Sequence, residues 1–179
     1  MEKINFRKVQ PSDLAAVMKI EQASFEAGIF ESESTYAERI KTFPDGFMLL
    51  EFDGAVIGYI CSEIWPYQKE IKAENFTLGH SIQESHNLSG EEIYISSMAI
   101  LPEYRGQGLG KLMFQKFLEH IQATFLHTHS IILIVSENWE RARKIYANNG
   151  FTEIDRIKDF FKYQAEEKVE DGIVMRKIL

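Results

Sequence analysis

The chain contains a single cysteine, Cys61, and no long hydrophobic run, and each shortage excludes some classes of protein. One cysteine excludes an internal disulfide and any metal site built from several cysteines, so no metal is expected. No apolar stretch approaches the roughly 20 residues that a membrane-spanning helix requires, and residues 1–10 lack the hydrophobic core of a signal peptide. We therefore expect a cytoplasmic protein without a membrane partner.

Positive charge is also scarce, since 20 lysines and arginines stand against 27 aspartates and glutamates, which leaves a net charge of -7. An acidic chain does not present the basic surface that nucleic acids attract, so no nucleic-acid partner is expected. With 179 residues, 45% of them hydrophobic, the chain is long enough for one sizeable core and short for two. The prediction is a single domain over residues 1–179.

Hydrophobic periodicity predicts strands and helices in alternation, which is typical of an α/β domain with one mixed sheet. Residues 66–90 lack clear periodicity and are expected to form a long loop or an irregular insertion. Strands are predicted at 4–9, in a hairpin over 46–65 that turns at Asp53 and Gly54, and at 92–101, 130–136, 151–157 and 172–179. Helices are predicted at 11–25, 34–42, 106–125 and 138–150.

Three glycines at alternating positions, Gly106, Gly108 and Gly110, come at the start of a predicted helix. The first N–H groups of a helix have no intrahelical partner, and together with the helix dipole they form an anion site. Glycines leave these N–H groups accessible, and Arg105 and Lys111 add positive charge beside them. A phosphate or pyrophosphate is therefore the expected ligand.

Two familiar phosphate-binding motifs do not match this spacing. A P-loop requires glycine where Arg105 stands and serine or threonine where Leu112 stands. A dinucleotide fingerprint that starts at Gly106 requires glycine where Lys111 stands. The pattern that is present is Arg-x-x-Gly-x-Gly over 105–110.

The block from Ile93 to Phe117, which contains this pattern, resembles the acetyl-CoA signature of the GNAT (GCN5-related N-acetyltransferase) superfamily. The likeness continues through "ARKIYANNGF" at 142–151 and extends more loosely to the N-terminal strand and helices. It implies an α/β (α+β) fold with a mostly antiparallel sheet of about seven strands flanked by about four helices. It also implies acetyl-CoA as the cosubstrate.

The resemblance implies how acetyl-CoA is held. In such proteins one strand pairs with pantetheine through its main chain, like an added strand, and the glycine loop holds the pyrophosphate. The residues that match these positions are Met98, Ala99, Ile100, Arg105, Gly106, Gln107, Gly108, Leu109, Gly110 and Lys111.

Tyr146 matches the tyrosine that, in many family members, donates a proton to the departing thiolate. The alternative is a packed helix tyrosine, because Ala142, Ile145 and Tyr146 form an apolar stripe. Asn138 resembles the family's cofactor-contacting asparagine, although an N-cap explains it equally well. The spacing from Asn138 to Tyr146 is one residue longer than usual, and Trp139 stands at the expected spacing, so either can occupy the cofactor position.

The general base is harder to assign. An alkylammonium must lose a proton before it attacks, and strand alternation places Glu92, Tyr94 and Ser96 on one face. Many relatives have glutamate or histidine at the positions of Tyr94 or Ser96. Since neither is present, Glu92 is the candidate base, with a solvated strand-end carboxylate as the alternative. His80 and His86 are further candidates.

The layout of the first helices and of the segments before residue 92 also resembles that of arylalkylamine N-acetyltransferases. This likeness implies an aromatic pocket and, as the partner, a small-molecule primary amine that attacks acetyl-CoA directly in a ternary complex. No cysteine nucleophile is needed. The aromatic residues that could line such a pocket are Phe25, Phe30, Trp65, Tyr67 and Phe76.

Two other functions stay open. Phe160 and Phe161 in "DFFKY" resemble the aromatic pair with which ribosomal-protein N-terminal acetyltransferases grip a peptide, which favours a protein N-terminal or lysine acetyltransferase. A non-catalytic acyl-CoA-binding protein would use the same glycine loop without an acid and a base. A homodimer is also open.

Overall fold

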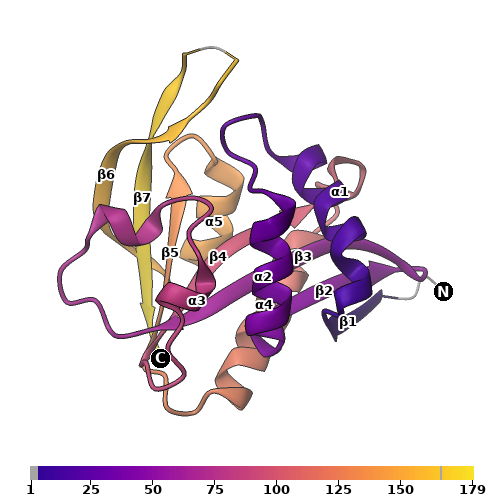
Figure 1. Ribbon diagram of the computed structural model, residues 1–179, viewed down its shortest axis with the longest axis horizontal. Helices are drawn as coiled ribbons and strands as arrows, with labels where there is room; N and C mark the ends of the chain where they lie inside the picture. Colours follow the sequence, from indigo (N-terminus) through magenta and orange to yellow (C-terminus); the bar gives the residue numbers. More distant parts are fainter. Residues whose placement is uncertain (1–3, 166) are drawn as a thin grey trace.

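One mixed sheet organises the computed structural model, which describes residues 4–165 and 167–179 (Figure 1). Its described strands number seven, as expected, and lie in the order β1-β2-β3-β4-β5-β7-β6. The strands are β1 (Ile4–Lys8), β2 (Phe47–Phe52), β3 (Ala55–Trp65), β4 (Glu92–Ile100), β5 (Ser130–Ser136), β6 (Thr152–Lys162) and β7 (Val169–Ile178). The helices are α1 (Leu14–Ser24), α2 (Glu33–Thr42), α3 (Ile82–Ser85), α4 (Leu109–Thr124) and α5 (Glu140–Asn148).

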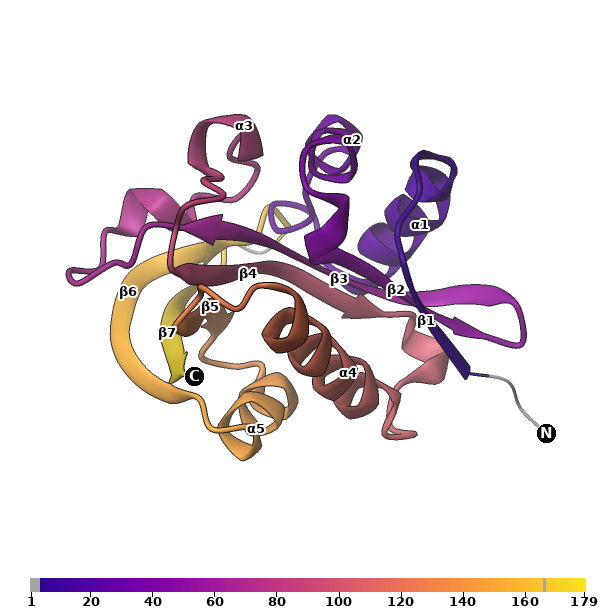
Figure 2. The ribbon, with the colours of Figure 1, turned by 90° about the horizontal axis from the view of Figure 1, so that it is seen from below.

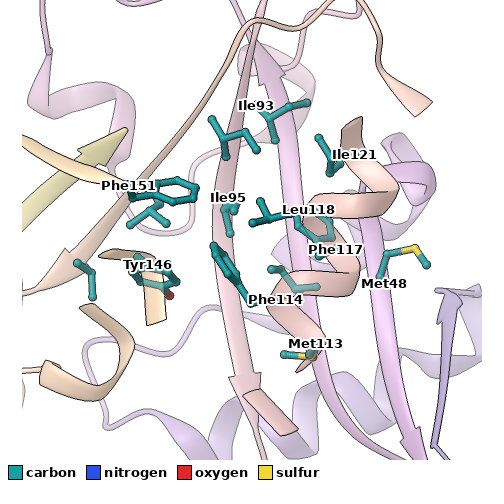
Figure 3. Packing of buried hydrophobic residues seen from close by; sticks show 14 of the residues in the cluster. Met48, Ile93, Ile95, Met113, Phe114, Phe117, Leu118, Ile121, Tyr146 and Phe151 are labelled. Atoms are coloured by element: carbon teal, nitrogen blue, oxygen red, sulfur yellow. The ribbon is translucent and has the colours of Figure 1, made fainter. Parts of the chain in front are cut away.

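The helices cover both faces of the sheet. Figure 2 shows α1, α2 and α3 on one face and α4 and α5 on the other. Between α4, α5 and the sheet lies the largest hydrophobic cluster, in which Phe114, Phe117 and Ile121 of α4 are fully buried (Figure 3). No helix within the described residues is both long and apolar enough to cross a membrane.

The β2–β3 hairpin has the predicted tight turn. Phe52 and Ala55 pair across it, and Asp53 and Gly54 both have positive φ angles, 47° and 82°. Two such residues are the signature of the type I′ turn, whose twist matches that of the strands.

A β-bulge in β4 changes which side chains share a face. Ile95 pairs with Ser62 of β3 and Ser97 pairs with Cys61, so Ser96 is an extra residue between them. The expected alternation of Glu92, Tyr94 and Ser96 is therefore wrong beyond Tyr94, because after a bulge the pattern shifts by one residue. Ser97 continues the face that Tyr94 begins.

β4 and β5 are the one parallel pair of neighbours in the described sheet, and they separate part-way along. Their pairing runs from Glu92 with Ser130 to Ile95 with Leu133 and then ends, at the bulge of β4. Beyond this point the β5-facing edge of β4 has no strand beside it in the described chain. The sheet is therefore split at its centre.

The C-terminal half departs from the sequence prediction in the length of its last hairpin. β6 and β7 extend five and three residues further toward their connection than predicted, and irregular pairing lets β6 curl around β7. Near the end of the hairpin, the Gln164 N–H donates to the Ala27 carbonyl at 3.0 Å. The hairpin thus touches the segment that joins α1 to α2. The 66–90 insertion holds two short helical turns, Ala73–Phe76 and α3.

Candidate active site

A cleft of about 610 Å³ lies where β4 and β5 separate. Its walls come from both layers of helices, since Ser24 belongs to α1, Gly110 to α4, and Ala142 and Ile145 to α5. Because α1 and α4 cover opposite faces of the sheet (Figure 2), the cleft passes between the two strands from one face to the other.

More than half of the predicted site residues border this cleft. Those that do are Met98, Ala99, Ile100, Arg105, Gly110, Asn138 and Tyr146. The remaining loop residues, Gly106, Gln107, Gly108, Leu109 and Lys111, lie beside its end at the start of α4. Of these, Leu109 buries its side chain in the core, while Gln107 donates to the Glu103 carbonyl at 3.2 Å.

The glycine loop has the backbone that this role requires. Gly106 and Gly108 have φ angles of +79° and +80°, which L-residues rarely adopt, and Gly108 is the N-cap of α4. A Cβ atom built on either glycine would have no atom within 4 Å. The space beside both glycines is therefore open, which suits the approach of an anion to the first N–H groups of α4.

The β5-facing edge of β4 provides a second set of main-chain groups. Met98, Ala99 and Ile100 pair with β3 on their other side. The Ile100 carbonyl accepts from Arg105 Nε at 3.0 Å and from Ser24 Oγ at 3.3 Å, which fixes the end of the strand. Beyond Ile95 this edge has no described strand beside it, which suits strand-like pairing with an amide-containing ligand.

Tyr146 lies on the α5 side of the cleft. It is 9% exposed. Its ring centroid lies 5.0 Å from that of Phe114 and 6.2 Å from that of Phe151. Figure 3 shows the three side chains packed in one cluster. No hydrogen bond joins its hydroxyl to another described residue. Burial raises the pKa of Tyr146 to about 12, so the phenol stays protonated at neutral pH. The cleft therefore contains a neutral O–H donor that is free for a ligand.

Asn138 and Trp139 both border the cleft, so the position of each allows the predicted contact with a cofactor. Trp139, rather than Asn138, is the N-cap of α5, so capping does not explain Asn138. The Trp139 ring lies 5.6 Å from that of Phe25 and 4.9 Å from that of Phe161. Trp139 thus links the wall formed after α1 to the wall formed by β6.

The predicted role of Glu92 is wrong on geometric grounds. Glu92 is 0% exposed and does not border the cleft. Arg176 of β7 holds it through two hydrogen bonds of 2.6 and 3.1 Å, and Ser130 Oγ and the Gln68 N–H donate to it at 2.8 and 3.2 Å. A carboxylate with four donors and no access to the cleft fixes β7 and the insertion to β4.

The two histidines of the insertion are also structural. His80 lies 2.5 Å from Glu63 and 2.8 Å from the Thr77 carbonyl, and His86 Nδ1 accepts from the Ile64 N–H at 3.0 Å. Neither histidine borders the cleft. They attach the 66–90 segment to β3.

The aromatic pocket has a different composition from the one expected. Of the five predicted residues, Phe25 alone borders the cleft. Trp65 and Phe76 pack with Tyr94 on the sheet, and Phe30 and Tyr67 are exposed. The aromatic wall is instead made by Phe25, Trp139, Phe161 and Tyr163, of which only Phe161 was singled out as the alternative peptide contact.

Charged side chains of both signs border the cleft. Arg105 and Arg141 do so near the starts of α4 and α5, together with Glu140, whereas Glu21, Glu26 and Glu31 do so in the last turn of α1 and just after it. Three of the four carboxylates thus lie beside the end of α1, which favours a cationic group there. Glu21 was not among the predicted site residues, although it stands among apolar positions of the helix predicted at 11–25, where a carboxylate is out of place.

Comparison with known protein families agrees with this geometry. The family described as "Acetyltransferase (GNAT) family" matches residues 14–151. Among curated proteins, an uncharacterised N-acetyltransferase of Bacillus subtilis is 24% identical over 125 residues, covering 66% of this chain and 55% of that protein. An uncharacterised N-acetyltransferase of Methanocaldococcus jannaschii is 26% identical over 171 residues, covering 96% and 89%. N-alpha-acetyltransferase 60 of Danio rerio is 29% identical over 122 residues, covering 68% and 48%.

Solved structures share the fold at low sequence identity. The loading GNATL domain of CurA from Lyngbya majuscula has a TM-score of 0.82 at 15% identity, and each chain is covered to 98%. The ribosomal-protein-S18-alanine N-acetyltransferase from Escherichia coli has a TM-score of 0.71 at 19% identity, with 99% of this chain and 94% of that chain covered.

Proposed function

Because the chain belongs to the acetyltransferase (GNAT) family, we propose that it transfers the acetyl group of acetyl-CoA to a primary amine of a small molecule. The reaction is a direct attack within a ternary complex, without a covalent acetyl-enzyme. Cys61 supports this, since the thiol is buried and burial raises its pKa to about 12, which removes its nucleophilic form.

The observation that carries the proposal is the position of Tyr146 in a cleft that opens at the glycine loop. Acetyl-CoA supplies a thioester, and its phosphates would bind the N–H groups at the start of α4 while Arg105 adds positive charge. Met98, Ala99 and Ile100 would pair with the amide groups of pantetheine. Tyr146 would then donate its proton to the sulfur that leaves.

The acceptor would enter from the α1 side. Glu21 and Glu26 favour a positively charged amine there, and the aromatic wall that includes Phe25 and Phe161 favours an apolar group next to it. The same wall is the observation that favours a second candidate, the free N-terminus of a protein. The relatives named N-alpha-acetyltransferase are consistent with this second candidate.

The test is the release of free thiol from acetyl-CoA with three acceptors: 2-phenylethylamine, spermidine, and a peptide with a free N-terminal methionine followed by phenylalanine. The same peptide with a blocked N-terminus is the matched control. Turnover of 2-phenylethylamine supports the first candidate, and turnover of the free peptide alone replaces it with the second. Saturable acetyl-CoA binding without turnover of any amine would overturn both and leave an acyl-CoA-binding protein.

A further inference from the structure

The side chains of Ser97, Tyr59 and Glu21 are joined by hydrogen bonds in the wall of the cleft, which Glu21 also borders. Ser97 of β4 borders the cleft, and its hydroxyl lies 2.9 Å from that of Tyr59 on β3. The Tyr59 hydroxyl donates in turn to the Glu21 carboxylate of α1. Tyr59 and Glu21 are 0% and 1% exposed, so Ser97 is the member of the chain that a bound molecule reaches most easily.

The bulge in β4 is what creates this chain. Without the extra residue at Ser96, strict alternation would turn Ser97 away from the face that carries Tyr94. With it, Ser97 stands opposite Cys61 on the α1 side of the sheet, next to Tyr59. The irregularity that ends the pairing of β4 with β5 therefore also delivers a hydroxyl to the cleft.

Glu21 is an unusual residue for this position. It is a carboxylate buried in the core, and no salt bridge joins it to a cation within residues 4–165 or 167–179. The nearby guanidinium of Arg39 is engaged by Glu31 at 2.6 and 2.8 Å. Besides Tyr59, Glu21 has the Glu31 N–H as a donor at 2.8 Å, and the Tyr36 hydroxyl also lies within hydrogen-bonding reach of its carboxylate. A buried ionisable group without a counter-ion opposes folding, which favours a functional reason for its presence.

We propose that Ser97, Tyr59 and Glu21 form a relay that removes the proton from the acceptor ammonium. This inference rests on the proposed function, because it concerns the same amine. Ser97 is the group that touches the ammonium, whereas Tyr59 and Glu21 act through it.

The protons balance along the relay. The ammonium gives one proton to Ser97 Oγ, the Ser97 proton passes to the Tyr59 oxygen, and the Tyr59 proton passes to Glu21. The result is a neutral amine, two unchanged hydroxyls and a protonated Glu21, which later releases its proton to water. When the amine nitrogen bonds to the acetyl carbon and the carbon–sulfur bond breaks, Tyr146 gives its proton to sulfur and recovers one from the nitrogen.

Glu21 is the one carboxylate of the relay and therefore its final proton acceptor. Burial raises its pKa, against the opposing hydrogen bond from Tyr59. Burial also raises the pKa values of Tyr36 on α2, Tyr59 and Cys61, so these stay protonated. The other charged groups facing Glu21 are Glu31 with its partner Arg39 and, at the cleft, Glu26.

The relay predicts a particular pH profile. An alkylammonium with a pKa of about 10.4 is almost entirely protonated at pH 7, and its neutral fraction rises about tenfold per pH unit. If the enzyme removes the proton itself, kcat/KM is flat between the pKa of Glu21 and about pH 9.5. If it depends on amine that is already neutral, log(kcat/KM) rises with unit slope over the same range.

The experiment measures this profile for the wild type and for Glu21→Gln, Tyr59→Phe and Ser97→Ala with 2-phenylethylamine. If the free peptide is the acceptor that turns over, the slopes are compared only up to about pH 7.5, below the α-amino pKa of about 7.7–8.0. Tyr67→Phe is the control, because it makes the same chemical change as Tyr59→Phe at an exposed tyrosine outside the cleft. Ser97→Thr keeps a hydroxyl and serves as the rescue variant.

We expect a flat profile for the wild type, Tyr67→Phe and Ser97→Thr. The three relay variants should lose about 100-fold in kcat/KM at pH 7 and recover with unit slope toward pH 9.5. A wild-type profile of unit slope, or relay variants that keep a flat profile, would overturn the relay while leaving the acetyltransferase in place. A wild type that turns over no amine contradicts the proposed function instead.

Discussion

Ser97 of β4 stands opposite Cys61 of β3, although Ile95, only two residues earlier, stands opposite the very next residue, Ser62. This mismatch of one residue marks the point where the sheet opens. On one side of the point β4 pairs with β5, and on the other side β4 borders the cleft. In the proposed reaction, the two substrates meet beside this bulge in β4.

Replacing Tyr146 with phenylalanine tests the proposed acid. We expect Tyr146→Phe to reduce kcat by about 100-fold, the lower part of the range for general acid catalysis. The fold should be unaffected, because no described residue hydrogen bonds to the hydroxyl. Thiol release and the melting temperature measure the two effects, with Tyr67→Phe, at an exposed tyrosine outside the cleft, as the control. Unchanged turnover would remove Tyr146 from the mechanism.

The glycine loop can be tested against a glycine of the same conformation elsewhere. Gly108 and Gly54 have φ angles of +80° and +82°, and a Cβ on either would meet no protein atom within 4 Å. Gly108→Ala and Gly54→Ala should therefore destabilise the protein equally, by about 1 kcal/mol. Only Gly108→Ala should weaken acetyl-CoA binding, by about tenfold, equivalent to about 1.4 kcal/mol. Titration calorimetry checks this, and equal affinities would argue against a diphosphate at α4.

Gly28 holds the last hairpin against the α1–α2 segment. Its φ angle is +97°, and a Cβ there would lie 2.4 Å from the Lys162 carbonyl oxygen, so the hairpin must move if the side chain grows. We expect Gly28→Ala to raise KM for the acceptor at least several-fold and to leave acetyl-CoA binding unchanged, because only the acceptor mouth is widened. Steady-state kinetics in both substrates separate the two. A rise in KM for acetyl-CoA alone would contradict this arrangement.

Glu92 should matter for stability rather than for chemistry. Glu92→Gln leaves Arg176 buried without its partner, a change that costs about 3–5 kcal/mol and lowers the melting temperature by about 10 °C. Glu91→Gln makes the same chemical change at the exposed neighbouring position and should have little effect. Below the melting temperature, kcat of Glu92→Gln should stay near the wild-type value. A kcat lost without any loss of stability would restore Glu92 as a base.

The contact of His80 with Glu63 predicts a pH-dependent stability. Burial lowers the pKa of His80, but the hydrogen bond and the charge of Glu63 outweigh it, so the pKa is raised. The stabilisation is therefore fully present below about pH 6.5, the unfolded value, and is lost as pH rises through the folded pKa. Burial raises the pKa of Glu63, but its donors outweigh this and lower it, so its contribution is present above the unfolded value of 4.5.

The stability difference between the wild type and His80→Gln should therefore be largest between about pH 5 and 6.5 and should shrink toward pH 9. Thermal unfolding at several pH values measures it, with His127→Gln, at an exposed histidine, as the control. A difference that grows with pH would mean that His80 is held in its neutral form.

Much of the fold could be predicted because its signals are local. The turn at Asp53 and Gly54, the helix that begins after Gly108 and the buried strand at 130–136 each follow from a few neighbouring residues. The bulge at Ser96 left no local signal, because it depends on how β3 and β4 pair. The hairpin of β6 and β7 is longer than predicted because its outer half packs on the α1–α2 segment, which is distant in sequence.

The residues of the site likewise differ in whether their sequence signal is local. Arg105, Gly108 and Tyr146 belong to contiguous patterns, which is why the sequence alone predicts a role for them. Glu92 was misassigned because its partner, Arg176, is 84 residues away, and no spacing rule connects the two. Glu21 was overlooked for the same reason, since Tyr59 and Ser97 give it a role only after α1, β3 and β4 have been brought together.

A cleft that crosses the sheet can be entered from either face. In the proposed reaction, acetyl-CoA enters between α4 and α5, and the amine enters between α1 and the last hairpin. Neither product then blocks the exit of the other, so dissociation in either order is sterically allowed. An inhibitor that joined an amine to coenzyme A would have to pass through the gap between β4 and β5. It would then block the entry of both substrates at once.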